Sequence, residues 1–255
     1  MEIQGKTILI TGGTAGIGLE AAKQFLANGA KVIITGRDQS KLDKAKKLYP
    51  TLIAIKSDVA NADDAQLLFN QIKELGGVDI LYNNAGVLSI STNMGVANDR
   101  HLKEAAYEMN VNYFGVIRLN NLFMDMLKSK QESAIINTTS ILSYVPSTIE
   151  ATYSASKVAL RFYTETLRKH LELLKSNVKI FELLPPVVAT EMTAGRNDKK
   201  ITPEKLVKAL IAGLKKEQFT IRVGDTKLIY IINRLFPKIA FDLVNPKKNA
   251  KQLLP

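Results

Sequence analysis

Cysteine and tryptophan are absent from this chain of 255 residues, and only two histidines occur. Without cysteine the protein can form no disulfide, no catalytic thiolate and no cysteine-ligated zinc or iron–sulfur centre. His101 and His170 fit no metal-binding or catalytic-triad spacing, so we expect them on the surface or in helix packing. The G-x-S-x-G nucleophile motif is also missing. The sequence therefore predicts no metal site and points away from hydrolase chemistry.

Long hydrophobic runs are missing too. The N-terminus lacks a basic segment followed by an apolar stretch. The most apolar C-terminal stretch, residues 228–244, is interrupted by Arg234, Pro237, Lys238 and Asp242, so it should not span a bilayer. Hydrophobic residues still make up 46% of the chain and charged residues 23%, which is typical of a globular protein. We expect a folded, cytoplasmic protein.

Acidic residues are scarce near the C-terminus. The chain has 35 Lys and Arg against 24 Asp and Glu, and residues 196–255 carry 14 of the basic and 5 of the acidic residues. Because the rest of the chain is nearly neutral, we expect no nucleic-acid partner. Residues 225–255 are predicted to be a basic amphipathic extension. A membrane-surface contact is possible there, but we favour an interface helix or plain solvation.

Short β-branched runs alternate with longer amphipathic segments. The expected strands are residues 7–11, 31–35, 51–56, 78–82, 134–139, 177–184 and 219–223. The expected helices are residues 16–28, 39–49, 62–75, 100–130, 152–175 and 203–216, followed after Gly224 by an amphipathic helix that breaks near Pro237. Repeated strand–helix–strand units predict an α/β fold with a doubly wound parallel sheet of about seven strands and helices on both faces. We expect one domain over residues 1–255, with residues 186–202 as a lid loop.

A glycine-rich segment, TGGTAGIG at residues 11–18, joins the first expected strand to the first helix. Glycines allow a tight turn and a close approach of pyrophosphate to backbone N–H groups at the helix N-terminus. No Gly-Lys-Ser/Thr follows, so this is not the P-loop of a nucleotide hydrolase. The segment predicts a Rossmann-type dinucleotide site. The contacts expected from it are Gly12, Thr14, Gly16, Ile17 and Gly18.

The G-x-x-x-G-x-G spacing of this segment resembles that of the short-chain dehydrogenase/reductase family. Four more features follow in the order that the family shows: N-N-A-G at residues 83–86, Asn112, Ser140, and Y-x-x-x-K at residues 153–157. The resemblance covers residues 6–223 and implies a single-domain, NAD(P)-dependent oxidoreductase. The double proline at 185–186 and VGD-x-K at 223–227 resemble the branch that includes the oxidoreductase encoded with bacterial teichoic-acid D-alanylation genes.

Tyr153 and Lys157 are the expected centre of catalysis. At positions i and i+4 of a helix, their side chains lie on one face. A nearby ammonium stabilises tyrosinate and should lower the pKa of the phenol, which suits Tyr153 to general acid–base work on a carbonyl or alcohol. Ser140 would bind the same substrate oxygen. The resemblance implies that Asn112 anchors a water linked to Lys157, and that Tyr153 and Lys157 also contact the cofactor.

Cofactor choice depends on the end of the second strand. Gly36 stands where an NAD enzyme carries a carboxylate for the ribose 2′-hydroxyl, and the next residue, Arg37, can bind a 2′-phosphate. The sequence thus predicts NADP(H), with Asp38 as a helix cap. Pro186 replaces the glycine usual in the family. The remaining contacts that the resemblance implies are Asp58, Val59, Asn84, Ala85, Gly86, Val188 and Thr190.

We therefore expect an NADP(H)-dependent oxidoreductase that interconverts a small-molecule carbonyl and alcohol by hydride transfer. Two alternatives remain: a catalytically vestigial NADP-binding regulatory protein, and a 3-oxoacyl-carrier-protein reductase whose basic tail binds its carrier. Specificity should depend on residues 88–99, 142–150 and 189–202. A homodimer or homotetramer is expected through the helices at 100–130 and 152–175. The residues predicted for that interface are Val116, Leu119, Phe123, Leu127, Val158 and Phe162.

Overall fold

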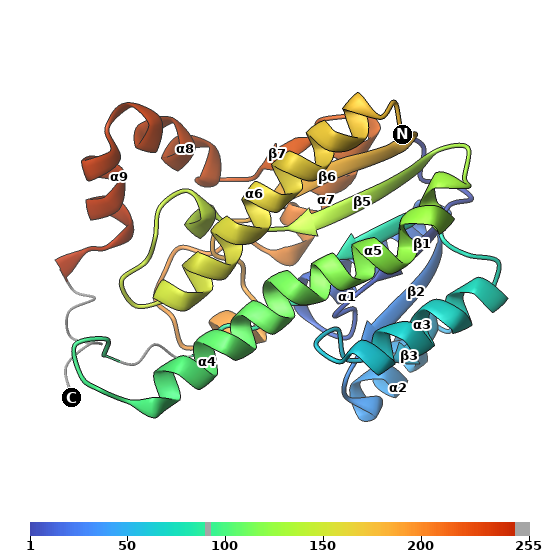
Figure 1. The fold of residues 1–255 in the computed structure, drawn as a ribbon, viewed down its shortest axis with the longest axis horizontal. Coiled ribbons are helices and arrows are strands. Elements are labelled where there is room, and N and C mark those ends of the chain that lie inside the picture. The colour runs from blue at the N-terminus through green and yellow to red at the C-terminus, as the bar shows by residue number, and fades with distance from the viewer. Residues whose placement is uncertain (90–92, 248–255) are drawn as a thin grey trace.

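Seven parallel strands form one sheet in the order β3-β2-β1-β4-β5-β6-β7 (Figure 1). The computed structural model describes residues 1–89 and 93–247. The strands are β1 (Thr7–Ile10), β2 (Lys31–Gly36), β3 (Ile53–Lys56), β4 (Ile80–Asn83), β5 (Ser133–Thr138), β6 (Val178–Leu184) and β7 (Thr220–Arg222). The order reverses between β1 and β4, and ligands bind at the carboxyl ends of the strands beside such a switch point. The predicted Rossmann fold is confirmed.

Helices cover both faces of this sheet. The helices are α1 (Gly16–Ala27), α2 (Gln39–Leu48), α3 (Ala62–Glu74), α4 (Asp99–Met109), α5 (Gly115–Lys128), α6 (Ala151–Leu173), α7 (Pro203–Lys215), α8 (Thr226–Leu235) and α9 (Pro237–Val244), and the last two project away from the sheet (Figure 1). Ile8 and Ile10 of β1 pack with α1, α2 and α7, while Leu9 packs on the other face with α3, α5 and α6. Successive residues of a strand thus pack into two separate cores on opposite faces of the sheet, which explains why the strands are apolar throughout.

Two predicted segments extend beyond the described residues. Residues 90–92 of the 88–99 segment and residues 248–255 of the C-terminal extension lie outside them. Within the described ranges, no helix combines the length and hydropathy needed to cross a bilayer.

The helix predicted over residues 100–130 is interrupted. Between α4 and α5 the chain forms a π-helical turn, Asn110–Phe114. Such a turn inserts one extra residue into a helix, and it is frequent at functional sites. The apolar spacing on either side is helical, so the sequence pattern did not reveal the interruption.

The interface predicted on α5 is wrong for four of its residues. Val116, Leu119, Phe123 and Leu127 are buried within this chain, and the last three pack in the core between α5 and the sheet. An apolar stripe on a helix has the same spacing whether it faces its own sheet or another subunit. Of the predicted interface residues, only Phe162, on α6, is largely exposed.

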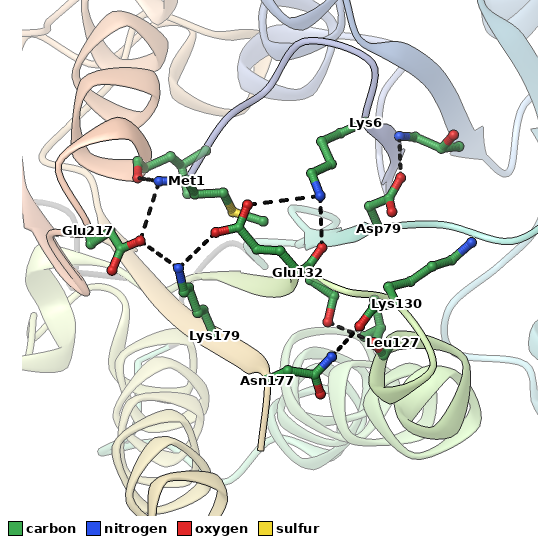
Figure 2. A network of polar contacts seen from close by, with 12 residues as sticks. Met1, Lys6, Asp79, Leu127, Lys130, Glu132, Asn177, Lys179 and Glu217 are labelled. Carbon is green, nitrogen blue, oxygen red and sulfur yellow. Dashed lines mark hydrogen bonds and ion pairs between the residues drawn. The ribbon is translucent and has the colours of Figure 1, made fainter. Parts of the chain in front are cut away.

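An ion-pair network closes the amino-terminal end of the sheet (Figure 2). The Met1 ammonium lies 3.4 Å from Glu217, and Lys179 of β6 pairs with both Glu217 and Glu132. The Lys6 ammonium donates to the Glu132 carbonyl oxygen at 3.0 Å. The network joins the starts of β1, β5 and β6 at the end of the sheet opposite the glycine-rich loop.

Candidate active site

The glycine-rich loop packs tightly against the N-N-A-G motif that follows β4. A Cβ placed on Gly12 would lie 2.9 Å from Ala85 Cα, and one on Gly18 would lie 2.2 Å from the Gly12 carbonyl oxygen. Asn84 Nδ2 donates to the carbonyl oxygens of Thr11 and Gly12, at 3.0 and 3.2 Å. The two motifs thus form one rigid unit in which the backbone itself lines the site.

The N-terminus of α1 opens from this unit. Ala15 is the N-cap residue of α1, and its side chain makes no capping hydrogen bond to the first turn of the helix. The first N–H groups of a helix need a partner and favour a negative charge. This arrangement can accept the pyrophosphate of a dinucleotide.

A cavity of about 370 Å³ lies beside the glycine-rich loop, at the carboxyl ends of β1, β2 and β4; we call it the nucleotide cavity. It brings together seven of the predicted cofactor residues. These are Gly12, Thr14, Arg37, Asp58, Val59, Ala85 and Gly86. Gly18 and Asn84 lie in the packing beneath the loop.

Two cations border the nucleotide cavity at the end of β2. The Arg37 guanidinium lies 3.8 Å from the Asp58 carboxylate and hydrogen-bonds to the Tyr107 hydroxyl. Lys41 also lines the cavity, with its ammonium 3.0 Å from Glu191. Sequence reasoning missed Lys41; the available signal was its place on the first turn of α2. Asp38 accepts from the Lys41 N–H, so its predicted capping role is confirmed.

The predicted catalytic residues meet where β5 ends. Ser140 begins the 3₁₀ turn Ile141–Ser143 (η2), and Tyr153 and Lys157 occupy the first two turns of α6. Ser140 hydrogen-bonds to the Tyr153 side chain. The Lys157 ammonium lies 5.6 Å from the centroid of the Tyr153 ring and donates to the Thr138 carbonyl oxygen at 2.9 Å.

Burial shifts the pKa values of both Lys157 and Tyr153. It lowers the pKa of Lys157 to about 8, because a buried ammonium loses its hydration. Burial also raises the pKa of Tyr153 above its ordinary value, and the charges of Glu150 and Glu108 raise it further against the opposing hydrogen bond from Ser140. The expected lowering of the Tyr153 pKa is therefore wrong for this structure. Lys157 is directed to a backbone carbonyl, and the protein holds Tyr153 as a protonated phenol.

Asn112 lies in the π-helical turn and is fully buried. Its Oδ1 accepts from the Val87 N–H at 2.9 Å, and its Nδ2 donates to the Val87 carbonyl oxygen and to Ser156 Oγ, both at 3.0 Å. A Cβ on Gly86 would lie 3.3 Å from Asn112 Oδ1 and 3.6 Å from Lys157 Nζ. Asn112 thus fixes the chain after the N-N-A-G motif next to Lys157. Its predicted part in a water relay stays a prediction.

Two further cavities lie at this end of the sheet, and Tyr153 lines the smaller one. The inner cavity, of about 110 Å³, is lined by Ser140, Tyr153 and three predicted cofactor residues, Ile17, Val188 and Thr190. A Cβ on Gly16 would lie 3.1 Å from Thr190, so the glycine-rich loop touches the same region. The outer cavity, of about 800 Å³, is mostly apolar. Its lining includes Leu88, Ile141, Leu142, Val187, Met192, Leu243 and Val244, together with Glu150, Arg196 and Asp198.

Residues 186–202 cover these cavities. The two ends of the segment are joined by backbone hydrogen bonds, from Ala189 to Ile201 at 2.9 Å and from Ile201 to Val187 at 3.0 Å. Arg196, in the middle, forms an ion pair with Glu150, three residues before Tyr153. The segment therefore adds a charged pair to a mostly apolar wall next to the phenol.

The sequence of the chain matches a family model described as short chain dehydrogenase over residues 6–201. The chain belongs to the short chain dehydrogenase family. It is similar to the uncharacterized oxidoreductase DltE of Bacillus subtilis (strain 168), with 34% identity over 224 residues that cover 85% of this chain and 87% of that protein. It is also 32% identical to a 3alpha-hydroxysteroid dehydrogenase of Mediterraneibacter gnavus, over 83% of each chain.

A solved structure shows the same fold. The short chain dehydrogenase of Burkholderia cenocepacia J2315 in complex with NADP matches this chain with a TM-score of 0.83 and 27% identity, over the whole of both chains. Membership of the family makes this protein an oxidoreductase that acts on CH–OH groups and binds a nicotinamide dinucleotide. The predicted resemblance to the oxidoreductase of the D-alanylation operon is confirmed by DltE.

Several residues that lie at the site of this short chain dehydrogenase could not be predicted from any sequence motif. Glu108 is fully buried on α4 and accepts from the Ser89 N–H at 2.7 Å, and Glu150 is buried beside Arg196. Leu243 and Val244 of α9 reach the outer cavity from beyond the family match, which ends at residue 201. These residues come from separate elements, and only the folded chain brings them together.

Proposed function

We propose that this short chain dehydrogenase is an NADP(H)-dependent enzyme that interconverts a carbonyl and an alcohol, with Tyr153 as general acid and base. The convergence of Ser140, Tyr153 and Lys157 beside the inner cavity, which Ser140 and Tyr153 line, carries the proposal. In the direction of reduction, a substrate oxygen in the inner cavity would accept hydrogen bonds from Ser140 and Tyr153. Tyr153, held protonated by burial, then gives its proton to that oxygen.

The residues present fit a dinucleotide. Cβ atoms on Gly12 and Gly18 would strike the backbone and one on Gly13 would strike the Ile34 side chain, and the N-terminus of the helix behind the loop is open to an anion. When bound, the cofactor supplies or accepts the hydride. Lys157, with its pKa lowered to about 8, is close enough to neutrality to exchange a proton during turnover.

Preference for NADP(H) rests on the end of β2. A Cβ on Gly36 would lie 2.8 Å from Thr14 Cγ2, so a residue with a carboxylate for the ribose 2′-hydroxyl fits there only if the Thr14 side chain moves. Arg37 and Lys41 supply two cations in its place. The Burkholderia cenocepacia relative, solved in complex with NADP, supports the same choice.

The outer cavity suggests the kind of substrate. Its volume of about 800 Å³ and its apolar lining suit a bulky ketone or secondary alcohol, and the relative from Mediterraneibacter gnavus is named for a hydroxysteroid. Arg196 and Glu150 would accept a polar group at one end of such a molecule. Residues 186–202 serve in this proposal as the substrate lid.

Replacing Tyr153 with Phe tests the function. NADPH oxidation is measured against a panel of cyclic ketones, quinones and dicarbonyls. The wild type should oxidise NADPH with at least one of them, and Tyr153→Phe should lower kcat by about 10²- to 10⁴-fold while the Kd for NADPH stays nearly unchanged. Full activity of the variant would refute the role of Tyr153. Saturable NADPH binding without any oxidation by the wild type would instead favour the vestigial regulatory protein.

A further inference from the structure

The helical hairpin of α8 and α9 projects from the α/β body at one end of the molecule (Figure 1). Its inner side is held by specific contacts. The Arg222 guanidinium lies 3.9 Å from the centroid of the Tyr230 ring and donates to the Tyr144 hydroxyl at 2.9 Å. Asn233 donates to the Tyr144 carbonyl oxygen at 3.2 Å, and Asn245, just after α9, donates to Pro146 at 2.9 Å. The hairpin therefore has one fixed orientation on the η2 region.

Its outer side is apolar and exposed. Leu228, Ile231 and Leu235 recur at i, i+3 and i+7 along α8, and Phe236, Ile239 and Leu243 repeat that spacing through α9. Each of these six side chains is between 47% and 64% exposed. Together they form what we call the hairpin stripe. Exposed apolar side chains that recur in this way along a helix mark a contact with another molecule or with a membrane.

Positive charge borders the hairpin stripe. Lys227 and Arg234, seven residues apart on α8, flank it on one side, and exposed Lys238 begins α9. Two acidic residues lie on the two helices and their cap, Asp225 and Asp242, and Asp225 lies 3.9 Å from Lys199. A helix with an apolar face and a basic border is the form that binds an anionic bilayer while lying in its plane.

A second copy of the chain fits this surface less well. In a two-fold interface the same patch meets itself, so the cations that border one hairpin stripe would face those of the other. A bilayer with anionic headgroups offers the complementary charge to all of them. We infer that α8 and α9 form a membrane-docking element that lays the hairpin stripe onto an anionic phospholipid surface.

The docking element also borders the outer cavity. Leu243 belongs to the hairpin stripe and lines the cavity, and Val244 and Pro246 continue the lining. Docking would bring the cavity to the lipid surface, where an apolar alcohol or ketone concentrates. This extension to substrate class rests on the proposed function, whereas the docking itself does not.

Vesicle binding tests the docking without any turnover. The full chain is sedimented with vesicles of phosphatidylcholine alone and with vesicles that also contain phosphatidylglycerol, at low and high salt. We expect binding to the anionic vesicles that falls as salt rises. Absence of binding, or equal binding to both kinds of vesicle, would overturn the inference.

Two triple variants measure separately what the basic residues and the apolar residues of the hairpin contribute to vesicle binding. Lys227→Glu, Arg234→Glu and Lys238→Glu together should weaken partitioning by about 100-fold, because each basic residue near an anionic surface contributes about fivefold. Leu228→Ser, Ile231→Ser and Leu235→Ser together should weaken it by more than about tenfold. Both variants should keep the wild-type melting temperature and NADPH affinity, since these side chains are exposed and line neither the nucleotide cavity nor the outer cavity.

Matched controls use another face of the protein. Exposed Lys44, Lys46 and Lys47 of α2 are changed to Glu for the same change in charge, and exposed Leu67 of α3 is changed to Ser. These variants should bind like the wild type. Equal loss in the controls would show that only net charge or general hydrophobicity matters, which contradicts a docking element. A smaller mass of the Ser variant by light scattering, without vesicle binding by the wild type, would identify the hairpin stripe as a subunit interface instead.

Discussion

The nucleotide cavity and the outer cavity are built in different ways. The first is shaped by the glycine-rich loop, where a Cβ on Gly12 or Gly18 would strike the backbone, and by a rim of charged side chains, Arg37, Lys41 and Asp58. The second is shaped by side chains of η2, of residues 186–202 and of α9. A cofactor that is the same in every turnover can be bound by backbone, whereas a substrate that differs between relatives is recognised by side chains. Four predictions can break or sharpen this contrast.

The largest effect is expected at the cofactor side. Changing Arg37 and Lys41 together to Glu should lower kcat/KM for NADPH by about 10³-fold, because two charge-assisted contacts to a phosphate are replaced by repulsion. The value for NADH should change little, so the preference between the cofactors shifts. Steady-state kinetics with both cofactors gives the ratio. An unchanged ratio would show that the 2′-phosphate does not bind at the end of β2.

Lys157, buried beside Tyr153, should make stability depend on pH. Its pKa is about 8 in the folded protein against an ordinary value of 10.5, so between these values the unfolded chain binds more protons. The free energy of unfolding should therefore rise with pH across this window, by about 3 kcal/mol for this group. Urea unfolding of the wild type and of Lys157→Met at several pH values gives the contribution of Lys157 to the free energy of unfolding. A difference between the two that does not change from pH 8 to pH 10.5 would contradict the lowered pKa.

On the substrate side, Leu243→Ala should act on substrate alone. Removal of part of the outer cavity wall should raise KM for a bulky ketone about tenfold, since a lost apolar contact of this size costs about 1–2 kcal/mol. The Kd for NADPH should stay at the wild-type value, because Leu243 does not line the nucleotide cavity. If both constants rise together, the two cavities are not independent.

The smallest effect is expected far from both cavities. Lys179→Ala removes the ion pairs that Lys179 makes with Glu132 and Glu217 at the amino-terminal end of the sheet (Figure 2). Because the partners are partly exposed, the free energy of unfolding should fall by less than about 1 kcal/mol, and kinetic constants should not change. Denaturant unfolding measures this, with Lys46→Ala as an exposed control. A loss of several kcal/mol would mean that the network is needed for the sheet itself.

The sequence could predict the features that depend on neighbouring residues, but not those that depend on contacts made only in the folded chain. The strands, the glycine-rich loop and the spacing of Tyr153 and Lys157 are local signals, because each depends on neighbours along the chain. The raised pKa of Tyr153 depends first on burial and then on Glu150 and Glu108, and burial and the approach of Glu108, 45 positions before it, arise only in the folded chain. The predicted α5 interface was wrong because periodicity shows that a helix face is apolar, but not what covers it.

The joined ends of residues 186–202 have a consequence for engineering and for divergence. Since Val187, Ala189 and Ile201 already lie side by side through backbone hydrogen bonds, the stretch between them forms a closed loop with its own base. A replacement of different length has only to start and finish at neighbouring points, and lengthening such a loop costs little entropy. Residues 191–200 should therefore be exchangeable between relatives as a cassette, and a graft from the hydroxysteroid dehydrogenase would leave in place the sheet and Thr190, the residue next to the glycine-rich loop.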